Sequence, residues 1–395
     1  MKEKEYISKA GLKGRGWTEA MVSRFLPECD REVRNPHYAC SGKMKLYSIS
    51  RVQDIEASEE FSNAVGEANR RRERMIQAKK EKRQAFQNFC SNSDLGIPLM
   101  GRDDVLDAAL ATYNGLMDDL LTVFGHGGTP EGYKPLTRDA DPVFLASLSW
   151  SYLRSQAKDF RSRIIKNYGT KMVDEALAII GSRISLKIDM LHPWIKETVQ
   201  HQDRYLFIDT ETTGLDVRYH HLVQVAWILT DEKDTPITSG NFIIQPQGFD
   251  IPVSASRIHG ITNRKAIAEG RPLKEVLRLL SYSFDAATTI VGHNPDFDLG
   301  FLYDAAKRSG IVLRKDHYVY DTADYGTWYC QLPSSSEYYE YRTPSLTVLY
   351  QQLFGHAFDG AHNAMADAQA ARRCYWELLR KKRYHQKVGR YVQGL

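Results

Sequence analysis

The sequence predicts an α/β fold in the C-terminal half of the chain, a mixed sheet flanked by helices, preceded by mainly α-helical N-terminal domains. Three apolar runs with short connections come first: YLFID at 205–209, LVQVAWIL at 222–229 and GNFIIQP at 240–246. Connections this short join only antiparallel neighbours, so the three runs predict a meander. Helical and strand patterns then alternate, which implies parallel strands joined by crossover helices.

The alternating part begins with PLKEVLRLLSYSF at 272–284, whose apolar residues recur on one helical face. TTIVG at 288–292 predicts a short strand, and a helix is expected from Pro295, because proline suits the first helical position and Asn294 suits the N-cap. HYVYD at 317–321 predicts another strand, and two final helices follow.

The first residues have a different pattern. Two short helices joined by the basic turn KGRG are expected within 5–26, followed by a short extended piece and a helix that starts near Ser50. This order resembles the winged helix-turn-helix of the MerR and excisionase type, in which one helix enters a DNA groove. A helical protein-interaction module is the alternative that the same pattern allows.

The rest of the N-terminal half is helical. We divide the chain into a winged helix-turn-helix at 1–56, a basic connector helix at 57–90, a helical domain of unknown role at 91–200, the α/β domain at 203–383 and a basic tail at 384–395. Apolar residues at helical spacing support the helical domain at 91–200, but the pattern does not indicate what this domain does.

The composition excludes several classes of protein. With 395 residues and 42% hydrophobic content, the chain has the length for two or three packed domains. It holds no apolar stretch that could span a membrane, so no membrane partner is expected. Its five cysteines are odd in number and form no C-x-x-C pair, which suits the reducing cytoplasm. Cys29, His37 and Cys40 could share a zinc ion, but a fourth ligand is missing.

The positive charges are clustered, although the net charge is only +4. Residues 70–83 hold eight Lys or Arg against two Glu, and 380–390 form a second basic run. Each run alone could be a solvated helix face. Together with a site that handles phosphate, they favour an anionic polymer as partner.

Carboxylates stand where the first predicted strand ends, in FIDTETTGLD at 207–216. Asp209 and Glu211 project to the same side if the strand persists that far. Two neighbouring carboxylates repel each other unless a cation lies between them, so a metal is the natural inference. A solvent-facing pair is the alternative. Asp216, the third acid, is expected to be solvated.

Two further motifs carry acids and a histidine. GHNPDFDLGFL at 292–302 places Asp298 in the first turn of a helix, where the macrodipole favours negative charge. AHNAMADAQAARR at 361–373 contains His362 and Asp367, which lie about 140° apart around a regular helix. His362 is therefore expected on the loop before the helix that carries Asp367.

The three motifs in this order resemble the DEDDh, or DnaQ-like, exonuclease family over residues 203–383. The matching segments are D-x-E at Asp209 and Glu211, HN-x-x-FD at 293–298, RIHGIT at 257–262 and H-x-x-x-x-D at His362 and Asp367. The resemblance implies a ribonuclease H-like fold. It also implies that all five expected catalytic positions are present: Asp209, Glu211, Asp298, His362 and Asp367.

The resemblance also implies roles. Asp209, Glu211, Asp298 and Asp367 would hold two Mg²⁺ ions, for which Mn²⁺ could substitute, because hard cations take oxygen ligands. His362 would be the general base. Thr213 and Leu215 would grip the terminal nucleotide, with a purely structural role at the strand exit as the alternative.

The expected function is therefore metal-dependent 3′→5′ exonuclease activity that releases nucleoside monophosphates. DNA is preferred over RNA as the nucleic-acid partner, because of the helix-turn-helix pattern and the basic runs, and a replication or repair protein is a possible further partner. An RNA-trimming exonuclease with the same site is the first alternative. A DNA-binding regulator without catalysis is the second, and the intact acids count against it.

Overall fold

A computed structural model describes residues 5–34, 43–122, 134–199, 202–335 and 338–381, with the backbone of 390–391. The chain forms two compact units. One comprises Met1–Asp94 with Arg163–Ile180, and the other comprises Leu95–Ser162 with Gly181–Leu395. The helical segment expected over 91–200 is thus divided between the two units and does not form a body of its own.

The C-terminal unit is built on a mixed sheet whose strand order is β6-β5-β4-β7-β8-β9. Its strands are β4 (Arg204–Thr212), β5 (Leu222–Asp231), β6 (Pro236–Ile243), β7 (Thr289–Gly292), β8 (Tyr318–Asp321) and the two-residue β9 (Arg390–Tyr391). The first three form an antiparallel meander. β7 runs parallel to β4, and β8 runs parallel to β7. The predicted α/β class, the meander and the parallel pairs are confirmed.

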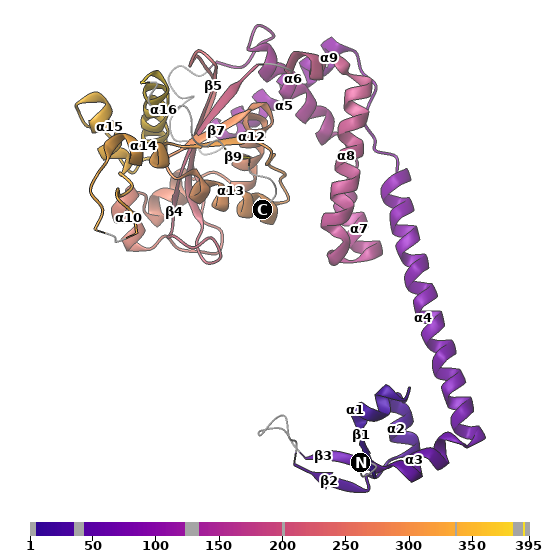
Figure 1. Cartoon of the computed structure of the whole chain (residues 1–395). Helices are drawn as coiled ribbons and strands as arrows, with labels where there is room; N and C mark the ends of the chain where they lie inside the picture. The colour runs from indigo at the N-terminus through magenta and orange to yellow at the C-terminus, as the bar shows by residue number, and fades with distance from the viewer. Residues whose placement is uncertain are drawn as a thin grey trace. The chain divides into compact units, whose positions relative to one another are not determined.

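Helices cover both faces of this sheet (Figure 1). Successive side chains of β4 point to opposite faces of the sheet. Leu206 and Ile208 pack in the core that includes residues of α12 (Leu273–Ala286) and α13 (Pro295–Ser309). Phe207 points the other way and packs on Tyr375 of α16 (Ala364–Arg380), with ring centroids 5.7 Å apart. The two faces of one strand therefore anchor helices from opposite sides.

Two helices from the segment before the sheet belong to the same core. They are α5 (Arg102–Thr122) and α6 (Pro142–Ser155), whose apolar residues join the cluster that contains Trp227 of β5. The hydroxyl of Tyr113 lies 2.7 Å from that of Thr238, which ties α5 to β6. These two helices thus form an outer layer of the sheet domain.

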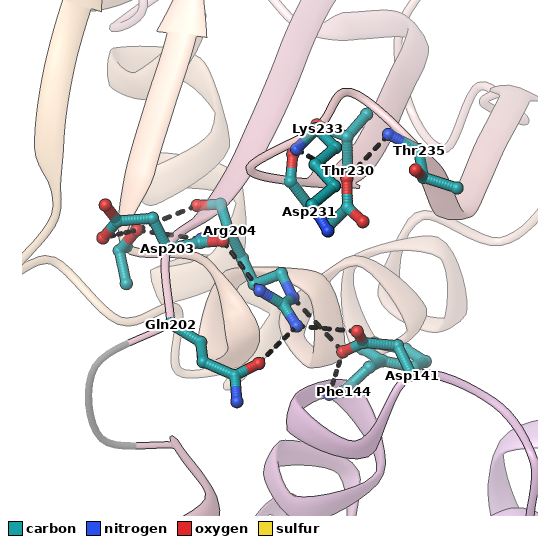
Figure 2. A network of polar contacts seen from close by, with 10 residues as sticks. Asp141, Phe144, Gln202, Asp203, Arg204, Thr230, Asp231, Lys233 and Thr235 are labelled. Carbon is teal, nitrogen blue, oxygen red and sulfur yellow. Dashed lines mark hydrogen bonds and ion pairs between the residues drawn. The ribbon is translucent and has the colours of Figure 1, made fainter.

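A nearly buried ion pair joins α6 to the start of β4 (Figure 2). The side chain of Arg204 is 4% exposed, and its Nη2 lies 2.6 Å from Oδ2 of Asp141. The Arg204 guanidinium also donates to Oε1 of Gln202 and to the carbonyl of Asp203. Oδ1 of Asp141 accepts the N–H of Phe144 at 2.8 Å, so the same carboxylate caps α6.

Further helical segments after residue 159 lie between and around the elements already named. They are α7 (Phe160–Tyr168), a 3₁₀ turn (Thr170–Met172), α8 (Val173–Leu191), α9 (Pro193–Val199), α10 (Val253–His259), α11 (Asn263–Glu269), α14 (Thr322–Cys330) and α15 (Leu346–Phe354). The sequence predicted neither α10 and α11 before α12 nor α14 after β8.

The start of α13 departs from the expected capping. Pro295 opens the helix and Asp298 lies in its first turn, as predicted. Asn294 occupies the N-cap, but its φ is 66° and its side chain makes no capping hydrogen bond. A side-chain cap usually needs an extended backbone at this position, and the left-handed conformation does not provide it. The backbone N–H of Asn294 instead donates to Oδ1 of Asp321 at 2.8 Å.

The N-terminal unit contains a small antiparallel sheet of order β1-β3-β2, more strand than the expected short extended piece. Its elements are β1 (Tyr6–Ser8), α1 (Lys9–Gly14), α2 (Glu19–Phe25), β2 (Arg31–Val33), β3 (Met44–Ser48), α3 (Ile49–Glu56) and α4 (Glu59–Asn92). Leu12, Trp17 and Tyr47 are central to its core. α4 confirms the long helix, and the winged helix-turn-helix interpretation stays a prediction.

Some predictions fall on residues outside the described ranges. His37 and Cys40 of the zinc hypothesis are among them, as is the tail at 384–395 apart from the backbone of 390–391. No disulfide joins the cysteines at 29, 90, 330 and 374. Within the ranges that the structure describes, every helix is too short or too polar to cross a membrane.

Candidate active site

The site begins at the end of β4, where the apolar strand gives way to acids. Asp209 pairs with Ala226 of β5, and Glu211 pairs with Gln224, before the register shifts between Glu211 and Thr212. Both acids are partly exposed. They alternate with Thr210, so they lie on the same face of the strand as Phe207, the face that α16 covers.

Asp367 comes to this face from the first turn of α16. Asn363 caps that helix, since its Oδ1 accepts the N–H groups of Met365 and Ala366 at 3.2 and 3.4 Å. Oxygens of Asp209, Glu211 and Asp367 all lie within 4.8 Å of one another. Of the His, Cys, Asp and Glu residues in the described ranges, these three form the group that is close enough to hold a metal ion.

Asp298 reaches the same place from the opposite face of the sheet. β7 ends at Gly292, and α13 starts just beyond it, beside the end of β4. Asp298 is only 4% exposed, and its Oδ1 accepts the hydroxyl of Thr210 at 2.6 Å. The predicted metal set is thus assembled in two parts: three acids that lie close together, and a fourth that is held by Thr210.

The charges of these acids oppose one another. Burial raises the pKa of Asp209 well above its usual range, and the charges of Asp298, Asp367 and Glu211 raise it further. Burial, then Asp367 and Asp298, raise the pKa of Glu211 to about 7. Burial also raises the pKa of Asp298 to about 7, although the Thr210 hydrogen bonds oppose this shift. Such mutual repulsion is relieved when a cation binds among the carboxylates.

His362 lies in the turn immediately before α16, as predicted, with a φ of 66°. Its side chain is exposed, and its backbone N–H donates to Oδ2 of Asp367 at 2.9 Å. Burial raises the pKa of Asp367, and this N–H and the nearby imidazole of His362 lower it in part. The turn therefore places an exposed imidazole next to the carboxylate cluster.

Several residues position the site although sequence reasoning assigned them no role. Oδ1 of Asp321 accepts the N–H groups of Asn294 and Ala323, both at 2.8 Å, which holds the turn before α13. His293 Nε2 lies 3.0 Å from the carbonyl of Pro344. The Oε1 of buried Gln224 accepts the N–H of Ala364 at 3.3 Å and joins β5 to α16.

The sequence contained a signal for only some of these residues. His293 stands in the HN-x-x-FD segment, so its position was visible although its contacts were not. Asp321 ends a predicted strand, and Gln224 interrupts an apolar run. A polar residue inside a buried strand is the signal that could have identified Gln224, because it must find a partner when buried.

The predicted nucleotide-contact residues differ in their surroundings. Thr213 is 6% exposed, and its Oγ1 accepts the N–H of His221 at 2.9 Å, which shapes the strand exit. Leu215 is 85% exposed in the loop after the carboxylates. Asp216 is not merely solvated: it accepts the backbone N–H of Arg218 and pairs with its guanidinium, which lowers the pKa of Asp216 to about 2.

Comparison with known proteins finds a family match for the part of the chain that contains these residues. Residues 206–375 match the family model of the RNase T type that is described as Exonuclease. The DNA polymerase III PolC-type protein of Streptococcus pneumoniae serotype 2 is 29% identical over 177 residues, which cover 45% of this chain and 11% of that protein. The PolC-type protein of Lactococcus lactis is 28% identical over 165 residues, 42% of this chain and 9% of its own length. The chain thus spans about a tenth of these relatives.

Among solved structures, exonuclease I of E. coli in complex with a dT13 oligonucleotide is similar to 47% of this chain, with a TM-score of 0.39 and 23% sequence identity, over 42% of its own length. The family match covers the residues that build the carboxylate cluster, from β4 to α16. Residues 206–375 therefore form an exonuclease domain, and this part of the chain belongs to the DnaQ-like exonuclease family.

Proposed function

We propose that the chain is a metal-dependent 3′→5′ exonuclease that hydrolyses phosphodiester bonds of DNA and releases nucleoside monophosphates. The observation that carries the proposal is the cluster of Asp209, Glu211 and Asp367, whose oxygens lie within 4.8 Å of one another at the end of β4. Asp298, held beside it by Thr210, completes the set of four acids.

The donor atoms fit divalent cations. All are carboxylate oxygens, which hard cations such as Mg²⁺ and Mn²⁺ prefer. Burial, and then the negative charge of the neighbouring acids, raises the pKa values of Asp209 and Glu211. Two Mg²⁺ ions bound by Asp209, Glu211, Asp298 and Asp367 would acidify the attacking water and neutralise charge on the leaving oxygen. Mn²⁺ is expected to substitute.

His362 acts as the general base in this proposal. Its exposed imidazole lies next to the carboxylates and takes a proton from water as the water oxygen bonds to phosphorus. The bond between phosphorus and the 3′ oxygen of the preceding nucleotide breaks, and that oxygen takes a proton from solvent. The products are a nucleoside 5′-monophosphate and a chain shortened by one nucleotide.

Exposed Leu215, with Thr213 at the strand exit, is proposed to contact the terminal nucleotide. DNA is the proposed polymer, since the relatives include PolC-type DNA polymerases. A replication or repair protein is a further proposed partner. We place the protein in the cytoplasm, where its cysteines would stay reduced.

The test uses single-stranded DNA and RNA oligonucleotides labelled at either end, with Mg²⁺ and then with a chelator. A 3′ label should leave at once as a mononucleotide, and a 5′ label should report a ladder of shortened chains. Asp209→Ala should abolish cleavage, whereas Asp216→Asn, an acid outside the cluster, should retain it. Undiminished cleavage by Asp209→Ala would contradict the proposal, and faster cleavage of RNA would reassign the polymer.

A further inference from the structure

The middle of α4 is exposed on every side. All residues from 69 to 85 are solvent-exposed, whereas Phe61 near the start of the helix and Phe86 near its end are buried. Contacts with another helix occur near the end of this stretch, where Arg83 pairs with Glu175 and the carbonyl of Ala85 accepts the hydroxyl of Tyr168. Ten of the 17 exposed residues are charged, eight as Lys or Arg and two as Glu.

One face of α4 is buried at both ends and runs uncovered through the middle. Its positions follow an alternating spacing of four and three residues: Phe61, Val65, Ala68, Arg72, Met75, Lys79, Lys82, Phe86 and Phe89. The first three pack in the core of the N-terminal unit. Phe89 contacts the ring of Tyr168, with centroids 5.7 Å apart. We call the exposed central part, Arg72, Met75, Lys79 and Lys82, the basic stripe.

The two acids in the exposed stretch of α4, Glu73 and Glu81, do not lie on the basic stripe. At 100° per residue, Glu73 and Glu81 each lie about 140° from the centre of the stripe, on the opposite side of the helix. Arg83 pairs with Glu175. The seven cations from Arg70 to Lys82 form no ion pair within the described part of the chain. Their charge is therefore not compensated locally.

The charge of the stripe excludes an apolar partner. A second copy of α4 docking by the same spacing would place Arg72, Lys79 and Lys82 in the core of a helix pair, where like charges repel and lose their hydration. An anionic polymer meets the opposite condition, because each cation can contact a phosphate and release a counterion. From Arg72 to Lys82 the stripe runs about 15 Å along the helix, at 1.5 Å per residue.

We propose that the basic stripe of α4 binds the sugar–phosphate backbone of nucleic acid, as a second contact outside the catalytic carboxylates. This inference rests on the proposed function in so far as the bound polymer is the substrate of the exonuclease. Met75, which is 69% exposed, adds an apolar contact between the cations. The surface would raise affinity for long substrates and leave the chemical step unchanged.

The test compares two triple variants of the full chain that lose the same charge. R72Q/K79Q/K82Q removes the stripe, and R70Q/R74Q/K80Q removes cations from the rest of the helix surface; glutamine keeps the helix propensity in both. Binding of fluorescein-labelled single-stranded and duplex DNA is measured by anisotropy in EDTA, which prevents cleavage. The stripe variant should bind about tenfold more weakly or worse, and its slope of log K against log salt for duplex DNA should fall by about 2.7.

Equal losses in the two variants would overturn the proposal, because binding would then follow total charge and not the stripe. Unchanged binding of the stripe variant would overturn it too. A third contradicting result would be a dimer of the wild type in sedimentation that the substitutions of the stripe variant, but not those of the other variant, convert to monomer. Because anisotropy is read without cleavage, a chain that binds DNA through the stripe but degrades nothing would refute the proposed exonuclease function alone.

Discussion

Replacing Glu211 with glutamine tests whether the acids of the site destabilise the fold when no cation is bound. Burial, together with Asp367 and Asp298, raises the pKa of Glu211 from 4.5 to about 7. The folded state therefore holds this proton more tightly than the unfolded chain does. The stability that the folded state gains from binding this proton is fully present below about pH 4.5, and it is lost as the pH rises through about 7.

The size of the effect follows from the shift. A rise from 4.5 to about 7 corresponds to about 3 kcal/mol in full. Glu211 is partly exposed, and solvent screening reduces the figure to about 1–2 kcal/mol. In EDTA at pH 8, Glu211→Gln should be more stable than the wild type by this amount, because the glutamine carries no charge. Near pH 4.5 the difference should shrink toward zero.

The assay is chemical denaturation of both proteins in EDTA across this pH range, followed by the same titration with Mg²⁺ or Mn²⁺. Added cation should stabilise the wild type more than the variant, because the variant lacks one ligand for the folded-state ion. Asp216→Asn is the control: Arg218 lowers the pKa of Asp216 to about 2, so the amide should give no gain. If Glu211→Gln is no more stable than the wild type at pH 8 in EDTA, the electrostatic reasoning is wrong.

Three further predictions concern the proposed general base His362, the ion pair between Asp141 and Arg204, and the packing of Gly240 against Trp227. His362→Asn keeps a residue that tolerates the φ of 66° and should lower kcat by about 10²–10⁴; a loss of less than about threefold in single-turnover cleavage would point to another base. Asp141→Asn keeps the cap of α6 but leaves Arg204 nearly buried without its charge partner, so the free energy of unfolding should fall by about 3 kcal/mol. The matched Arg138→Gln removes an exposed pair with Asp107 and should cost less than about 1 kcal/mol; equal losses in denaturation would show that burial is not the cause. Gly240→Ala places a Cβ against the indole of buried Trp227 and should lower stability by about 1–3 kcal/mol, whereas Gly115→Ala meets no atom and should be neutral or stabilising; similar melting temperatures for the two would contradict the overlap.

Local patterns predicted the elements with strong periodicity and short connections. β4, β5 and β6 were identifiable as a meander because chain lengths between them permit no other pairing. The short helices α10, α11 and α14 were missed, since they span few residues and form in loops that the sheet holds in place. α5 and α6 were assigned to a separate helical domain, because an apolar helix face does not indicate which surface it covers.

The amino-acid sequence by itself predicted where the acids and the histidine of the candidate site lie within their own strand, helix or turn. It placed Asp209 and Glu211 on one face of a strand, Asp298 in the first turn of a helix and His362 in the turn before Asp367, because each of these relations is set by backbone periodicity within a few residues. Tertiary structure decided how they meet. Asp367 arrives with α16 on one face of the sheet, and Asp298 arrives with α13 from the other, where the Thr210 hydroxyl holds it. Their separation in the chain is bridged by packing of the whole sheet, which no local pattern encodes.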